Sequence, residues 1–185
     1  MIIFGIVFAV VVVVLILWFV GAYNGLVRLR NQVKNAWAQI DVQLKRRHDL
    51  IPNLVEVVKD YMDYESEVLQ KVVQARSAAV RAQGPAASGQ AEGALTEALH
   101  GLYVVMESYP DLKANQNVSQ LQEELTSTEN KIAFARQYYN DSVTRFNTRT
   151  EVIPTNIIAG MCGFTKEELF EIPEAEREVP KVDLR

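Results

Sequence analysis

The chain has 185 residues, with 19 Lys and Arg against 23 Asp and Glu, and a formal net charge of −4 at pH 7. Such a small net charge creates no strong positive field, so nucleic-acid binding is not expected. The lone cysteine, Cys162, excludes an intramolecular disulfide and is compatible with either redox compartment.

The run from Ile2 to Ala22 contains no charged residue. At about 1.5 Å per residue, residues 2–22 would form a helix of roughly 31 Å, which matches a hydrocarbon core of about 30 Å. The alternative is a cleavable secretory signal, which needs a basic segment before a shorter apolar stretch. No Lys or Arg precedes this run, so we expect residues 2–22 to be an uncleaved transmembrane anchor.

The orientation of the anchor follows from basic residues near its ends. Arg28, Arg30 and Lys34 follow the apolar run and none precede it, which favours a short N-terminus outside and a cytoplasmic remainder. A large domain can nevertheless be translocated despite nearby charge. We therefore expect a single-pass protein of a bacterial inner membrane, with its bulk in the cytoplasm.

Beyond the anchor, apolar residues recur at the three- and four-residue spacing of a helix face. The anchor is expected to continue as a first helix, whose face carries Leu26, Val33, Trp37, Ile40, Leu44 and Ile51. A second helix is predicted to begin near Pro52, because proline's fixed φ and missing N–H suit a first helical turn. Its face carries Leu54, Val58, Tyr61, Met62, Leu69, Val72, Arg76 and Ala79.

Residues 84–93 have the Gly, Pro and Ser content of a flexible loop. A third helix should follow and end before Pro110, since the residue before a proline disfavours the helical conformation. Its apolar positions are Leu95, Ala98, Leu102, Val105 and Met106.

A fourth helix is predicted over residues 117–150, where apolar positions alternate by three and four. Ser119 and Gln122 indicate a capping box, with Asn117 as the competing N-cap, and Pro154 ends the helix. The apolar positions are Val118, Leu121, Leu125, Thr128, Ile132, Ala135, Tyr139, Ser142 and Phe146.

Thr165 and Glu168 then indicate a short capped helix, and the acidic tail 171–185 should be frayed. No segment shows the alternation of a β-hairpin. The predicted fold class is therefore all-α, with the anchor followed by one domain over residues 23–170, an antiparallel bundle of about four long helices.

Candidate chemistry is sparse, with His48 and His100 as the two histidines. Glu97 and His100 have the spacing of half a di-iron carboxylate site, but the second half is missing because Lys45 stands three residues before His48. Cys162 has no nearby His and is interpreted as a small packing residue. No catalytic motif is found, so we expect no catalytic, cofactor-binding or metal-binding residues and no enzymatic activity.

Three other features carry open alternatives. The cluster Lys45, Arg46 and Arg47 could bind acidic lipid or an acidic partner, or could be a solvated, salt-bridged helix surface. The segment Tyr109–Asn115 could be a partner-binding corner, or a turn that satisfies its own backbone. Tyr139 is expected in the core, with Tyr138 at its flank.

Taken together, several segments make the chain similar to the LemA family of bacterial membrane proteins, from the anchor to about Phe170. The segments are YNGLVRLRN (23–31), AW (36–37), IDVQLKRR (40–47), DLIPNLVE (49–56), YPDLKAN (109–115), LQ (121–122), TEN (128–130) and YN (139–140). The resemblance implies a cytoplasmic bundle of long antiparallel helices behind an N-terminal span, and no catalytic or cofactor-binding residues. Members of this family often occur beside a membrane zinc metalloprotease or TPM-domain proteins, so the resemblance also implies that the chain binds a partner protein. It further implies a relationship to a magnetosome-membrane protein.

Three function hypotheses follow. The first is a non-enzymatic, membrane-tethered scaffold or interaction protein that binds the lipid bilayer and either forms a homo-oligomer or binds another membrane protein. The second is a self-assembling protein that organises the membrane. The third is an enzyme or metal carrier built on Glu97 and His100, which elemental analysis would detect.

Overall fold

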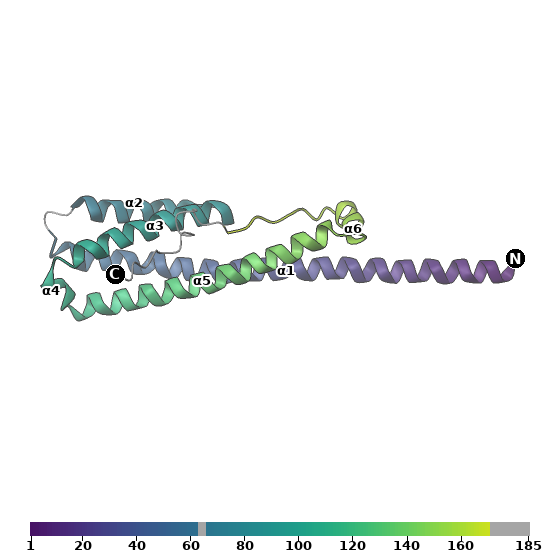
Figure 1. The fold of residues 1–185 in the computed structure, drawn as a ribbon, viewed down its shortest axis with the longest axis horizontal. Helices are drawn as coiled ribbons and strands as arrows, with labels where there is room; N and C mark the ends of the chain where they lie inside the picture. The colour runs from purple at the N-terminus through teal and green to yellow at the C-terminus, as the bar shows by residue number, and fades with distance from the viewer. Residues whose placement is uncertain (63–65, 171–185) are drawn as a thin grey trace, which may run out of the picture. The chain divides into compact units, whose positions relative to one another are not determined.

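A computed structural model of the chain describes residues 1–62 and 66–170, which are helical or irregular and contain no strand. The helices are α1 (Ile2–Lys59), α2 (Ser66–Arg81), α3 (Pro85–Met106), α4 (Pro110–Lys113), α5 (Gln116–Glu151) and α6 (Thr155–Met161) (Figure 1). The all-α prediction is confirmed. The tail 171–185, predicted to be frayed, lies outside the described residues.

The chain divides into two compact units. The first, unit 1, contains residues 1–38 and 137–168, and the second, unit 2, contains 39–136 and the described residues 169–170. The long helices α1 and α5 each contribute one part to unit 1 and another part to unit 2.

Helix α1 does not stop at Pro52, so the prediction of a helix starting there is wrong. A proline within a helix leaves the carbonyl four residues earlier without its donor, and here that carbonyl belongs to His48. Arg76 of α2 donates from Nε to this oxygen over 2.7 Å. The guanidinium thus replaces the missing N–H of Pro52, and α1 continues to Lys59.

The predicted loop over residues 84–93 is also wrong, because α3 begins at Pro85 and is helical throughout this stretch. Gly84 adopts a φ of 85° and Pro85 takes the first helical position, a combination that starts a helix sharply. Ser88, Gly89 and Gly93 are buried. Their small size allows neighbouring helices to approach α3 closely. The Gly and Ser content of residues 84–93, which suggested a flexible loop, is therefore explained by helix packing.

The apolar core of unit 2 is built from every helix that contributes to that unit. Its buried members are Ile51, Leu54, Val58, Met62, Leu69, Val72, Ala79, Leu95, Leu99, Leu102, Met106, Leu112, Val118 and Leu125. Nine of the thirteen positions predicted for the second and third helix faces are among them, so the apolar spacing identified most of this core even where the helix boundary was wrong.

Helix α5 spans Gln116–Glu151, within one residue of the prediction at each end. Its N-cap is Asn115, whose side-chain oxygen accepts hydrogen bonds from the N–H groups of Asn117 (2.9 Å) and Val118 (3.4 Å). The predicted Ser119–Gln122 capping box lies inside the helix. Because α4 and Asn115 satisfy the local backbone, the turn interpretation of residues 109–115 is confirmed.

The short helix predicted at Thr165 and Glu168 is instead α6, ten residues earlier in the chain. Residues 164–168 are irregular because their backbone groups bind side chains of α5. Asn147 exchanges two 2.9 Å hydrogen bonds with the backbone of Glu167, and the Tyr139 hydroxyl donates to the Glu168 carbonyl over 2.8 Å. These bonds replace those that a helix would make.

Arg76→Met should lower the free energy of unfolding by about 1.5–3 kcal/mol, because the His48 carbonyl loses a charged donor. In a Pro52→Ala background the restored N–H can serve that carbonyl, so the same substitution should cost less than about 1 kcal/mol. The measurement is urea unfolding of the full chain in mild detergent, followed by circular dichroism. Arg81→Met, on the exposed end of α2, is the matched control, and equal costs in both backgrounds would contradict the role assigned to Arg76.

Candidate functional site

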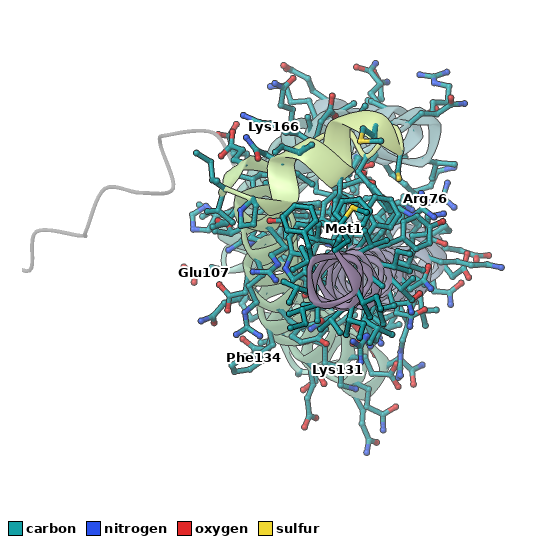
Figure 2. All side chains as sticks on the ribbon, turned by 90° about the vertical axis from the view of Figure 1, so that its right-hand side faces the viewer. Met1, Arg76, Glu107, Lys131, Phe134 and Lys166 are labelled. Atoms are coloured by element: carbon teal, nitrogen blue, oxygen red, sulfur yellow. The ribbon has the colours of Figure 1, made fainter. Side chains whose placement is uncertain are left out.

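The N-terminal part of α1 has an apolar surface that no other described segment covers. Its large apolar side chains are exposed almost without interruption from Ile2 to Val20. Figure 2 looks along α1 from the Met1 end. By length and composition α1 is able to cross a membrane, and none of its most apolar window is buried.

Unit 1 becomes packed where this apolar segment ends. Ala22 and Leu26 are buried, and the ring of Tyr23 lies edge-on to Phe164 with 5.8 Å between centroids. Phe164 also meets Phe146 of α5 at 6.3 Å and lies 5.0 Å below the guanidinium of Arg30. This aromatic cluster ties α1, α5 and the segment after α6 together.

A second aromatic contact in unit 1 joins Trp37 of α1 to Tyr139 of α5, at 5.5 Å between centroids. Tyr139 is buried, and this burial raises the pKa of its hydroxyl to about 12, with the carboxylates of Glu167 and Glu168 adding to the rise. The phenol therefore stays a hydrogen-bond donor at neutral pH. Tyr138 is exposed and accepts a bond from Gln32, so the core and flank roles predicted for the two tyrosines are confirmed.

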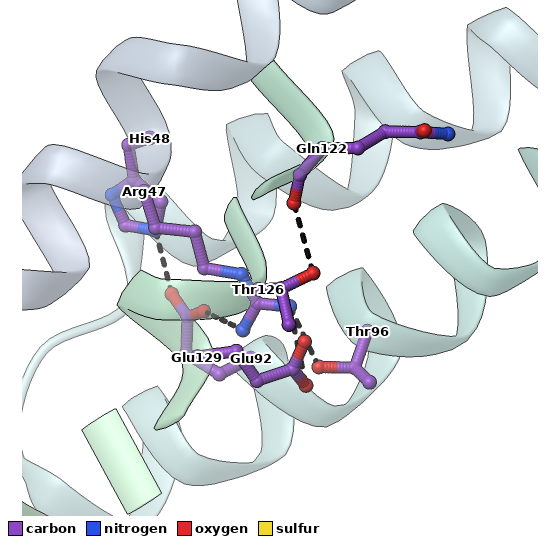
Figure 3. Close-up of polar contacts among 7 residues, drawn as sticks. All are labelled: Arg47, His48, Glu92, Thr96, Gln122, Thr126 and Glu129. Atoms are coloured by element: carbon purple, nitrogen blue, oxygen red, sulfur yellow. Dashed lines mark hydrogen bonds and ion pairs between the residues drawn. The ribbon is translucent and has the colours of Figure 1, made fainter. Parts of the chain in front are cut away.

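Unit 2 contains a buried polar cluster that connects three helices (Figure 3). Arg47 of α1, 3% exposed, pairs with Glu92 of α3 at 3.2 Å and donates to Thr96 over 2.8 Å. The other carboxylate oxygen of Glu92 lies 2.6 Å from Nε2 of His48. Glu129 of α5 stands 3.9 Å from the same guanidinium.

The cluster borders a cavity of about 120 Å³, which Gly89, Gly93 and Phe170 help to line. This volume is well below the roughly 300–1,000 Å³ of ordinary ligand pockets. The charges of this cluster also act on the half-buried Tyr103. Burial raises the pKa of the Tyr103 hydroxyl, the positive charge of Arg47 opposes this rise, and the negative charge of Glu129 adds to it. The arrangement therefore stabilises charge inside the unit, beside a cavity that is small for a ligand pocket.

The three residues of the basic cluster, Lys45, Arg46 and Arg47, differ in burial. Lys45 and Arg46 are exposed, and Arg46 forms a solvent-exposed pair with Glu124 at 3.2 Å. The salt-bridged interpretation is confirmed for Arg46, whereas Arg47 is buried instead of solvated. Glu92 was not predicted as a partner, although Arg47 occupies the core position between Leu44 and Ile51, where a buried charge needs an opposite charge beside it.

The other candidate residues do not form a site. Glu97 and His100 are both exposed on α3, and His48 contacts Glu92 instead of either of them. Within the described residues no group of three or more His, Cys, Asp and Glu could hold a metal ion. Cys162 is exposed, so its interpretation as a packing residue is wrong.

Comparisons with known proteins agree on one family. The model of the LemA family matches residues 36–184. Protein LemA of Metamycoplasma hominis is 29% identical over 86% of this chain and 73% of its own length. The magnetosome proteins MamQ 2 of Paramagnetospirillum magneticum and MamQ of Magnetospirillum gryphiswaldense are 23% and 22% identical, over 80% of this chain. The chain spans 64% of the length of each of these two.

Arg47→Met should lower the free energy of unfolding by about 3–5 kcal/mol, because Glu92 would remain buried without its guanidinium. Arg46→Met removes an exposed pair and should cost less than about 1 kcal/mol. The double variant Arg47→Met/Glu92→Met removes both buried charges and should be more stable than Arg47→Met alone. Urea unfolding of the full chain in mild detergent measures all three, and a double variant no better than the single one would refute the pairing argument.

Proposed function

Because the chain belongs to the LemA family, we propose that it is a non-enzymatic, membrane-anchored helical protein that works by binding other proteins. The observation that carries the proposal is the uncovered apolar surface of α1 from Ile2 to Val20, which continues without a break into the packed part of unit 1. The two alternatives to an anchor are a core helix and a cleaved signal sequence. A core helix would have its apolar surface covered by other segments, whereas no other described segment covers that of α1. A signal sequence is removed from the mature protein and has no need to continue into a packed helix.

The anchor is proposed to cross the membrane once, with the N-terminus outside and the helical units in the cytoplasm. Arg28, Arg30 and Lys34 support this orientation, because they follow the apolar segment directly. The family match begins at residue 36, so support for the anchor comes from this chain's own apolar segment.

The non-enzymatic part of the proposal is supported by the buried charges of unit 2. Arg47, Glu92 and His48 engage one another, and the cavity beside them is small. A general acid or base needs access to a substrate, which this packing does not provide. Such a cluster is better suited to holding helices in one register than to turnover.

A partner is proposed to bind the outer face of α5 in unit 2. Phe134 is 74% exposed there and lines a shallow hollow together with polar residues that include Asn130 and Lys131. Figure 2 labels Phe134 and Lys131. Aromatic residues are enriched at protein-binding surfaces, so the ring of Phe134 is the proposed anchor for the partner. The partner would be a second copy of the chain or another membrane protein, such as the metalloprotease or TPM-domain proteins considered above.

The full chain should fractionate with membranes after carbonate washing, and its intact mass should still include residues 2–22. Loss of this segment from the mature mass, or release by carbonate, would show that α1 is not an anchor.

Orientation is measured on a Cys162→Ser/Lys131→Cys variant in spheroplasts with a membrane-impermeant maleimide. Labelling is expected only after permeabilisation, whereas a Cys162→Ser control with one cysteine in a short polar extension before Met1 should label in intact spheroplasts; the reverse pattern would place the bundle outside.

Size-exclusion chromatography with light scattering on the gently solubilised full chain should reveal either a defined homo-oligomer or a co-purifying membrane protein. Phe134→Ser should reduce the associated fraction by about tenfold, as for loss of an exposed aromatic contact, whereas Val104→Ser, at an exposed apolar position of α3, should change it little. A monomer without a partner would contradict the proposal. A large homo-oligomer would favour the alternative, a self-assembling membrane organiser, which kinship with magnetosome proteins supports.

A further inference from the structure

Helix α6 and the turn before it present an exposed apolar row. Ile153, Ile157 and Met161 follow one another at intervals of four residues and are 83%, 60% and 74% exposed. The opposite side of the helix is buried through Thr155, Ile158 and Ala159. Ile157 and Met161 lie four residues apart on one face of α6, and Ile153 is exposed in the turn directly before the helix, so the three apolar side chains are neighbours in this segment.

The structure fixes α6 to the end of the apolar segment of α1. Gly163, at a φ of 70°, turns the chain after α6, and the N–H of Phe164 donates to the Ala159 carbonyl over 2.9 Å. Phe164 then packs against Tyr23, the first residue after the apolar run 2–22. The exposed face of α6 therefore lies at the level where α1 changes from apolar to polar.

The direction of α6 also matters. In Figure 1 it is seen nearly end-on beside α1, and in Figure 2, along the α1 axis, it extends lengthwise across the view. The two views agree that α6 lies across the axis of α1. A helix with this direction would lie in the plane of any bilayer that α1 crosses.

We propose that α6 is an interfacial membrane helix, whose apolar face enters the lipid at the boundary between headgroups and acyl chains. The proposal rests on the proposed anchoring of α1. An amphipathic helix in the plane of the interface buries its apolar face at this depth. Arg28 follows Tyr23 by five residues and Arg149 follows Phe146 by three, both are exposed, and they would attract anionic headgroups. The lipid therefore meets this unit at two places, the span and α6.

Cys162 is the sole cysteine and directly follows α6, so it offers a native labelling position. The full chain labelled there with an environment-sensitive fluorophore is reconstituted in vesicles of phosphatidylcholine and phosphatidylglycerol. Nitroxide groups on lipid headgroups or shallow acyl positions should quench the fluorophore, and deep nitroxides should quench it less. A Cys162→Ser/Gln137→Cys variant, labelled beside Tyr138 far along α5, should not be quenched.

Ile157→Glu places a charge on the apolar face without touching the core and should reduce the quenching at Cys162 at least about twofold. Thr144→Glu, at an exposed position of α5, is the matched control and should leave the quenching unchanged. Circular dichroism verifies that both variants fold. Equal quenching in Ile157→Glu and Thr144→Glu would overturn the role of the α6 face.

Flotation of the same vesicles separates this proposal from the one on which it rests. Protein that fails to float with the lipid refutes the anchoring itself. Protein that floats with an unquenched Cys162 fluorophore leaves the anchor standing and overturns the interfacial helix. Efficient Cys162 to Cys162 crosslinking in place of lipid quenching would also overturn it, because the face would then be covered by a second copy.

Discussion

The organisation of unit 2 depends on how one stretch of α1, from Arg47 to Pro52, satisfies its polar groups. The side chains of Arg47 and His48 bind Glu92 of α3, while the carbonyl of His48 accepts a hydrogen bond from Arg76 of α2. Apolar contacts tolerate small slips between helices, but a buried charge without its partner costs several kcal/mol. These contacts therefore define one register for α2 and α3 on α1, and the surrounding apolar core packs around that register.

Unit 1 is organised by aromatic rings instead of charges. Phe164 touches Tyr23 and Phe146, and Trp37 meets Tyr139, so rings connect α1 with α5 along the length of the unit. Rings with polar edges suit a region next to a membrane, because they tolerate both an apolar and a hydrated neighbourhood. The proposed interaction role fits this division, with a unit adapted to the lipid boundary and another held rigid by internal ion pairs.

Much of this fold could be predicted because helical spacing is a local property of the sequence. The apolar face of α5 followed from the alternation of three and four residues, and its limits, predicted at 117 and 150 from capping residues and Pro154, lie within one residue of the observed 116 and 151. Features that depend on distant residues could not be predicted in this way. Pro52 was predicted to start a helix, because nothing local shows that Arg76, on another helix, supplies the hydrogen bond that lets α1 continue. The composition of residues 84–93 suits a flexible loop and a tightly packed helix equally well. Glu92 was missed for the same reason, since it lies within that stretch.

The continuity of α1 has a mechanical consequence for the proposed anchor. No glycine-rich linker or loop separates residues 2–22 from the part of the helix that carries Tyr23 and Trp37. A helix whose apolar stretch exceeds or falls short of the hydrocarbon thickness adapts by tilting, and a stiff rod tilts as a whole. A change in bilayer thickness would therefore tilt the part of α1 that packs against α5 in unit 1 as well. Through this tilt, the local lipid composition would act on the folded part of the protein.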